Sequence, residues 1–151
     1  HNESDMAADE ATKIYRVELK LYNFLTAQTK QVNSEEYQEL LGTLEQNLYR
    51  EIKPHFDRLR RVEVSEVSSE DNGRSGAVAN GNALVIVDLT VGLKSKEDKD
   101  ETQPLTVALN SVIKDRTIGS FSVDANYLVV ARKDGKLSSW IRKCNKCVLC
   151  D

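Results

Sequence analysis

The chain lacks cysteine over most of its length and lacks any long apolar run. All three cysteines, Cys144, Cys147 and Cys150, fall at the carboxyl end of the 151 residues. No disulfide bond can therefore join elements within the main body of the chain. No apolar run approaches the ~20 residues that a membrane-spanning helix requires. We therefore expect no membrane insertion of this segment.

The spacing of the three cysteines, C-x2-C-x2-C, leaves two interpretations open. Three thiolates could be ligands of a zinc ion or an iron–sulfur cluster. No fourth ligand lies nearby, and an odd number of cysteines is expected where a Cys-rich module continues beyond the segment. We favour disulfides with each other or with parts outside the segment, and expect no metal site. The sequence begins with His1 and has no signal-peptide pattern, so we take it as a segment of a longer protein.

The sequence also lacks the residue patterns of common enzymes and of nucleic-acid-binding proteins. Neither histidine, His1 or His55, has an acid or nucleophile at a spacing that suggests a relay. Gly73, Gly76 and Gly81 lead into a strand-like stretch, whereas phosphate-binding loops lead into a helix. The net charge of −3 argues against nucleic acid, whose binding proteins usually have a concentrated basic face. We expect no enzyme, no cofactor and no nucleic-acid partner.

Apolar residues that alternate with polar ones predict strands at 14–22 and 61–67. The stretch "NGNALVIVDLTV" enters a more continuous apolar run, which favours a strand in mid-sheet from Ala83 to Leu93. A last strand is expected over 118–130, followed by a hairpin-type turn at 133–136. The Ser-, Asp-, Asn- and Gly-rich residues 68–82 predict a long loop.

A period of three to four residues predicts two helices. The first follows a cap at Asn33 or Ser34 and ends at Pro54, unless Pro54 starts a short second helix. The later helix has Pro104 in its first turn, after a charge run at 94–103 that we expect to be solvated. The expected apolar stripes are Tyr37, Leu40, Leu41, Leu44, Leu48, Tyr49 and Ile52 in the first helix and Leu105, Ala108, Leu109, Val112 and Ile113 in the later one.

This order of elements predicts an α+β, ferredoxin-like sandwich: a four-stranded antiparallel sheet with helices packed on one face. The expected division is a polar arm at 1–13, a domain at 14–131, and a hairpin or linker at 132–151 that leads into the Cys-rich segment.

The element order and four stretches resemble a SEA domain, the module named for sperm protein, enterokinase and agrin. These stretches are "EEYQELLGTLEQNLYREI", "RRVEVSEV", "GNALVIVDLTVGL" and "IGSFSVD". The resemblance implies an extracellular setting in mucins, receptors, transmembrane proteases or matrix proteins. It also implies a place for self-cleavage, because many SEA domains cut a Gly-Ser bond in the loop that enters the third strand. There the serine hydroxyl attacks the preceding carbonyl, and water hydrolyses the resulting ester.

The matching place in this chain reads Gly81-Asn82-Ala83, which keeps the glycine and lacks the hydroxyl. Neither Asn82 nor Ala83 can form the ester, so the resemblance predicts a domain that does not cut itself. A true Gly-Ser pair occurs at Gly119-Ser120, and it would be the scissile bond if the count of strands were wrong.

Two basic sequences could be cut by other proteases. "RLRR", ending at Arg61, has the form of a proprotein-convertase site, but it borders a helix and a strand. Arg74-Ser75 would suit a trypsin-like protease and lies in the predicted loop.

The leading expectation is a non-enzymatic structural or adhesion module of a larger membrane-anchored or secreted glycoprotein. Asn2 lies in a glycosylation sequon. The partners would be adjacent domains and an unknown protein or glycan. The alternatives are a domain that cuts itself or is cut and so releases an ectodomain, and an intracellular α+β module that binds a peptide.

Overall fold

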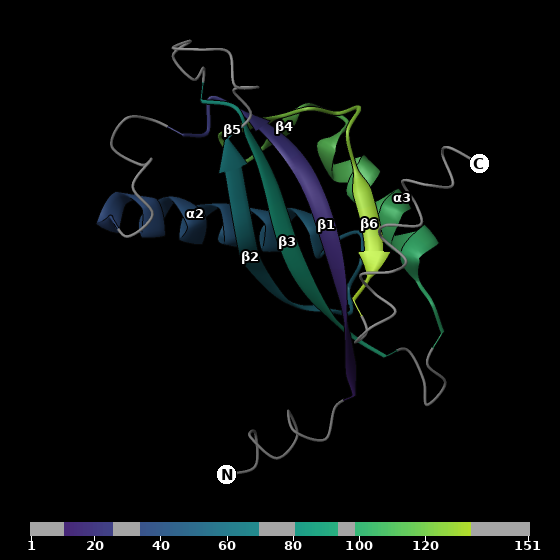
Figure 1. Ribbon diagram of the computed structural model, residues 1–151. Helices are drawn as coiled ribbons and strands as arrows, with labels where there is room; N and C mark the ends of the chain where they lie inside the picture. The colour runs from purple at the N-terminus through teal and green to yellow at the C-terminus, as the bar shows by residue number, and fades with distance from the viewer. Residues whose placement is uncertain (1–10, 26–33, 70–80, 94–98, 134–151) are drawn as a thin grey trace, which may run out of the picture.

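The computed structural model describes residues 11–25, 34–69, 81–93 and 99–133. Within these ranges the chain forms two helices and six strands (Figure 1). In chain order they are β1 (Thr12–Tyr22), α2 (Glu35–Ile52), β2 (Leu59–Ser69), β3 (Ala83–Gly92), α3 (Thr102–Ile113), β4 (Thr117–Ile118), β5 (Phe121–Val123) and β6 (Val129–Arg132).

All six strands belong to one open antiparallel sheet with the order β2-β3-β1-β5-β4, in which β6 also pairs with β1. The α+β class and the antiparallel pairing were predicted, but the expected number of four strands is wrong. Strands that precede residues 70–80 alternate across the sheet with strands that follow them. The sheet is therefore built jointly by the two halves of the chain.

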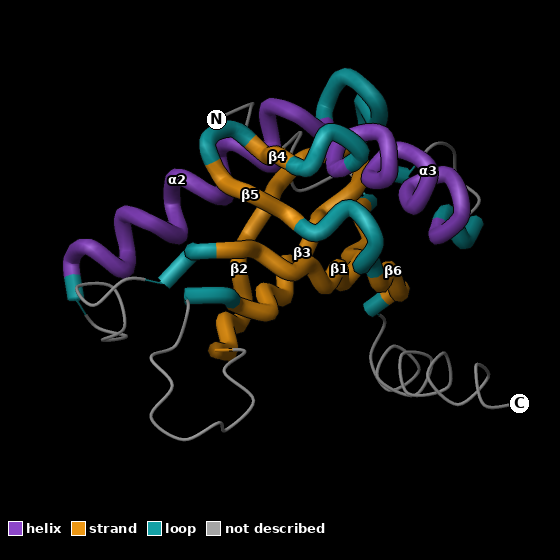
Figure 2. The backbone as a smooth tube through the Cα atoms, turned by 90° about the horizontal axis from the view of Figure 1, so that it is seen from above, coloured by secondary structure: helices purple, strands orange, loops and turns teal. Residues whose placement is uncertain are grey.

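Both helices lie on the same face of the sheet, with α2 crossing behind β2 and β3 and α3 beside β6 (Figures 1 and 2). The apolar residues between helices and sheet form a single core. In β1 the expected alternation is confirmed, since Tyr15, Val17, Leu19 and Leu21 are all buried. Val17 lies opposite Val87 of β3 on one side and Val130 of β6 on the other, so β1 is central to the sheet.

Helix α2 begins where its capping residue satisfies an unpaired backbone group. The Ser34 Oγ accepts a hydrogen bond from the Tyr37 N–H at 3.0 Å, which favours Ser34 over Asn33 as the cap. Most of the predicted stripe is buried or half-buried, but Tyr49 is 37% exposed. The helix ends at Ile52, and the residues around Pro54 form turns rather than a second helix.

Helix α3 buries the five predicted residues, Leu105, Ala108, Leu109, Val112 and Ile113. Pro104 lies in its first turn, where a missing N–H costs no intrahelical hydrogen bond. The sequence therefore predicted both the position and the buried face of this helix.

The expected continuous strand over 118–130 is wrong, because the chain turns twice within it. Gly119 has a φ of +60° and lies in the turn of the β4–β5 hairpin. After β5, the Asp124 carboxylate accepts from the Asn126 N–H at 2.9 Å and the Asp124 carbonyl accepts from the Tyr127 N–H at 3.2 Å. The side-chain bond competes with the hydrogen bonds of a strand, and together the two bonds form the turn that separates β5 from β6.

The first strand begins at Thr12 rather than at the expected Ile14. Lys13, expected in the polar arm, is buried at 3% exposure. At the other end, β6 extends to Arg132. The predicted turn at 133–136 and the segment that leads to the cysteines fall largely outside the described residues.

Candidate functional site

The predicted site lies at the start of β3, where Gly81 has a left-handed backbone with a φ of +83°. A Cβ atom at this position would lie 2.6 Å from the Leu25 carbonyl oxygen and 3.2 Å from the Asn23 Cα. A residue other than glycine would therefore clash with backbone atoms as well as adopt a strained φ. The glycine is required by the approach of the segment that follows β1.

The Gly81 carbonyl accepts two backbone hydrogen bonds, from the Phe24 N–H at 2.7 Å and the Leu25 N–H at 2.9 Å. Two N–H groups directed at one carbonyl oxygen polarise it, and they would stabilise negative charge that developed there during nucleophilic attack. The carbonyl at the bond between residues 81 and 82 is thus held and polarised by two backbone donors.

Asn82 supplies no nucleophile to this carbonyl. Its Oδ1 atom accepts a hydrogen bond from the Asn23 N–H at 3.0 Å, which ties the side chain to the end of β1. An amide lacks the hydroxyl that ester formation requires. Ala83 is fully buried and pairs with Leu21 of β1. We call Gly81, Asn82 and Ala83 the junction. It combines a polarised Gly81 carbonyl with side chains that cannot attack that carbonyl.

The second Gly-Ser pair, Gly119-Ser120, lies in the β4–β5 hairpin turn and not at the entry to β3. The Gly119 N–H donates to the Glu51 carboxylate at 2.6 Å. A Cβ at Gly119 would lie 2.5 Å from the Asn47 side chain. This glycine therefore serves a tight turn that packs against α2.

A buried group of charges links β1 to the beginning of α3. The Glu101 Oε2 atom lies 2.7 Å from Lys13 Nζ and 2.7 Å from Arg58 Nη1, while Arg58 Nη2 contacts the other carboxylate oxygen. The bidentate contact with Arg58, helped by Lys13 and opposed by burial, lowers the pKa of Glu101 from 4.5 to about 2. We call Lys13, Arg58 and Glu101 the buried charge cluster.

Tyr15 extends this cluster, because its hydroxyl oxygen accepts the Glu101 N–H at 2.6 Å. Burial raises the pKa of the Tyr15 hydroxyl to about 12, against the opposing effect of that hydrogen bond. Every carboxylate oxygen in the cluster faces a cation, so the arrangement fixes the start of α3 on β1. The part of the chain that the structure describes holds no group of three or more His, Cys, Asp or Glu suited to a metal ion.

The remaining predicted site residues are placed as follows. Arg61 lies in β2, with its main chain opposite Thr90 of β3, so a protease could reach this bond only after the strand had left the sheet. The other predicted positions, Asn2, Arg74, Cys144, Cys147 and Cys150, lie outside the described residues.

Sequence reasoning missed the three partners of the junction, Asn23, Phe24 and Leu25. The one sequence signal among them is that residue 23 is an asparagine. Its φ is +54°, a conformation that asparagine tolerates better than most residues. It also missed the burial of Glu101, which lies at the end of a charge run expected to be solvated.

The comparisons with known proteins assign no family. No family model matches the chain, and no curated protein matches it. Among solved structures, it is similar to a hydantoinase/carbamoylase family amidase from Burkholderia ambifaria, with 12% identity and a TM-score of 0.37 over 92% of this chain. The chain spans 34% of that amidase. This likeness is too low to carry an argument about fold or function. Neither described helix has the length and apolarity needed to cross a bilayer.

Proposed function

We propose that the chain is a SEA-like domain that stays uncut and serves as a structural or adhesion module in the extracellular part of a larger glycoprotein. One observation carries the proposal. At the entry to β3, Gly81 has the left-handed backbone and the doubly hydrogen-bonded carbonyl suited to cleavage, while Asn82 stands where a hydroxyl would be needed. The site keeps its shape without its nucleophile.

The sheet supports the family resemblance. The order β2-β3-β1-β6 with both helices on one face is the arrangement expected of a ferredoxin-like β-α-β-β-α-β chain. In this reading the β4–β5 hairpin is an addition on the β1 side of the sheet.

The same junction explains why self-cleavage should not occur. Formation of an ester would need a hydroxyl oxygen at residue 82, and the Asn82 side chain is held instead by the Asn23 N–H. Replacement of that side chain by a hydroxyl would supply what the polarised Gly81 carbonyl lacks. The proposal therefore predicts an intact natural domain and a cleavable Asn82→Ser variant.

Mass spectrometry of the denatured protein tests this. The unmodified chain should give one full-length species, whereas part of the Asn82→Ser protein should split into residues 1–81 and 82–151. Asn82→Ala, which lacks a hydroxyl, and Ala83→Ser, which moves it by one residue, are the matched controls and should stay whole. A cut in the unmodified chain at Gly81-Asn82 or Gly119-Ser120 would refute the proposal. An Asn82→Ser protein that folds and stays whole would remove its main support.

The extracellular setting has a separate test, because the sequon and the cysteines report on the compartment. In the full-length parent isolated from cells, Asn2 should carry a glycan and Cys144, Cys147 and Cys150 should be oxidised. An unmodified Asn2 together with three free thiols would favour an intracellular module instead.

A further inference from the structure

We propose that the groove between α2 and the edge strand β2 binds an extended acidic peptide from a partner protein. The groove has a volume of about 780 Å³, within the usual range of ligand sites. It lies on the sheet edge away from β1, so it is distinct from the junction at Gly81. The inference goes beyond the proposed function, and it would stand if the domain were not SEA-like.

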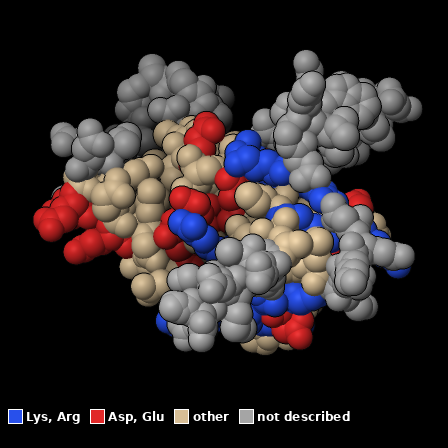
Figure 3. All heavy atoms as spheres, turned by 90° about the horizontal axis from the view of Figure 1, so that it is seen from below, with Lys and Arg blue, Asp and Glu red and all other residues tan. Residues whose placement is uncertain are grey.

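The groove concentrates positive charge on a chain whose net charge is −3. Four cationic side chains line it: Arg50 from α2, Lys53 directly after α2, and Arg60 and Arg61 from β2. On the described part of the face seen in Figure 3, acidic and basic side chains are interspersed. Charge complementarity therefore favours an anionic occupant.

The hydrogen bonds that position Arg50 and Lys53 do not neutralise their charges. Lys53 Nζ donates to the Leu59 carbonyl at 2.7 Å, and Arg50 Nη1 donates to the Asn47 side-chain oxygen at 3.1 Å. Both acceptors are uncharged, so neither hydrogen bond cancels the positive charge of its donor. The pairing of Arg61 with Glu63 spans 3.7 Å between side chains that are both more than half exposed, and a pair of this kind is weak.

Among the described residues, one carboxylate lines the groove, and it is already engaged. Glu45 Oε2 accepts the Val64 N–H at 2.9 Å, a backbone group on the outer edge of β2. Because backbone groups of alternate residues point the same way in a strand, the Val62 N–H and C=O face this outer edge too. An extended peptide can therefore pair its main chain with β2 at Val62, as in other cases of strand addition.

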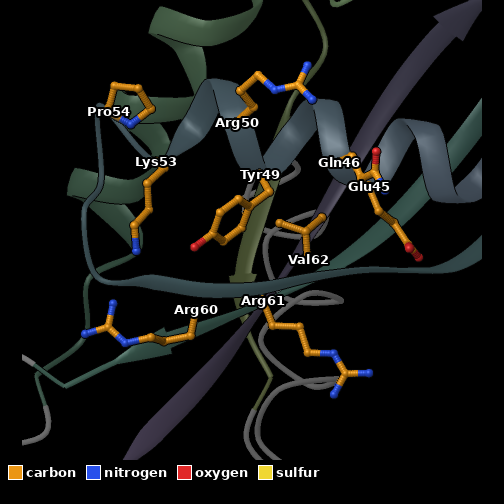
Figure 4. Close-up of a pocket in the computed structure, with 9 residues that line it drawn as sticks. All are labelled: Glu45, Gln46, Tyr49, Arg50, Lys53, Pro54, Arg60, Arg61 and Val62. Carbon is orange, nitrogen blue, oxygen red and sulfur yellow. The ribbon is translucent and has the colours of Figure 1, made fainter.

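The side chains around this edge suit both faces of such a peptide (Figure 4). Tyr49 of α2 and Lys53, which directly follows α2, point toward the strand, whereas Arg61 extends on the opposite side of β2. The Lys53 Nζ lies 5.5 Å from the centre of the Tyr49 ring, so an apolar contact and a cation occur side by side. Since side chains of an extended peptide alternate in direction, acidic residues on one face would meet Arg61, and an apolar and an acidic residue on the other would meet Tyr49 and Lys53.

Fluorescence polarisation with a labelled peptide that repeats Glu-Val-Glu-Glu tests the proposal. In an extended conformation this peptide has glutamates on one face and alternating valine and glutamate on the other. The intact domain should bind it, and added salt should weaken the binding because the contacts are solvent-exposed charges. Arg60→Glu and Arg61→Glu should each weaken binding about fivefold or more. Tyr49→Ala should weaken it about tenfold through loss of the apolar contact. Lys114→Glu, the same change of charge at an exposed position outside the groove, should leave it unchanged.

Circular dichroism of each variant verifies that it is folded before its affinity is compared. A peptide N-methylated on alternate residues should bind more weakly, because it cannot donate main-chain hydrogen bonds to β2. The proposal is overturned if the acidic peptide does not bind at millimolar concentration, or if Lys114→Glu weakens it as much as Arg60→Glu. It is also overturned if a sulfated oligosaccharide binds at the groove and the peptide does not.

Discussion

Replacement of Glu101 by glutamine should remove the centre of the buried charge cluster with almost no change of shape. The carboxylate is the shared partner of Lys13 and Arg58, at 2.7 Å from each. The Lys13 side chain is only 1% exposed, so without Glu101 its charge would remain buried and lose its counter-ion. Removal of one partner from a buried ion pair typically costs about 3–5 kcal/mol.

The pKa of Glu101 gives an independent magnitude. It falls from 4.5 to about 2 on folding, and each unit corresponds to about 1.4 kcal/mol. Ionised Glu101 therefore stabilises the folded state by about 3 kcal/mol near neutral pH. The two routes agree, and we expect Glu101→Gln to lower the free energy of unfolding by about 3 kcal/mol.

Urea denaturation at a series of pH values measures this effect. Because the pKa of Glu101 is lower in the folded state, its contribution is complete above the unfolded-state pKa and is lost as pH falls toward the folded-state pKa. The difference between the natural chain and Glu101→Gln should therefore be largest at pH 7 and shrink between about pH 5 and about pH 2.

Glu63→Gln is the matched control, since Glu63 pairs with Arg61 at 3.7 Å on an exposed part of β2. We expect its effect to stay below about 1 kcal/mol. A Glu101→Gln protein as stable as the Glu63→Gln protein at neutral pH would refute the reasoning, as would a difference independent of pH.

Two further changes probe the contacts next to the cluster and at the junction. Tyr15→Phe should lower the free energy of unfolding by about 1–3 kcal/mol, because the buried Glu101 N–H loses its acceptor; urea denaturation measures this. An absorbance titration of the same variant should lack the tyrosine with a pKa of about 12. Gly81→Ala should lower the free energy of unfolding by about 2 kcal/mol or more, because the φ of +83° and a clash with backbone atoms both oppose a side chain at this position. Amide exchange at Phe24 should then become faster, and unchanged exchange would contradict the proposed geometry.

The parts of the fold set by local period could be predicted from the sequence. The buried face of α3 and the alternation of β1 follow directly from the spacing of apolar residues, because one buried face per element imposes that spacing. The place where a strand ends depends on weaker signals. The turn at Asp124 depends on one carboxylate bonding to the main chain, and the apolar residues around it look like a continuous strand.

The buried charges could not be predicted, because burial of a charge depends on partners that are distant in sequence. Lys13 and Glu101 are far apart along the chain, and each stands in a polar stretch that is typical of solvated surface. The junction shows the same limit. The sequence singled out Gly81 as a candidate, but the N–H groups of Phe24 and Leu25 reach its carbonyl only because β1 pairs with β3.

The central place of β1 constrains when the domain can fold during synthesis. Its neighbours on the two sides are β3 and the pair β5 and β6, all of which follow residue 81, whereas β2 does not touch it in the sheet. A nascent chain that has emerged only as far as β2 therefore contains β1 and β2, which do not pair with each other. Contacts so distant in sequence make folding slow and leave strand edges exposed in the meantime. Folding of this domain on the ribosome should thus wait for β3 and reach completion only after β6 has emerged.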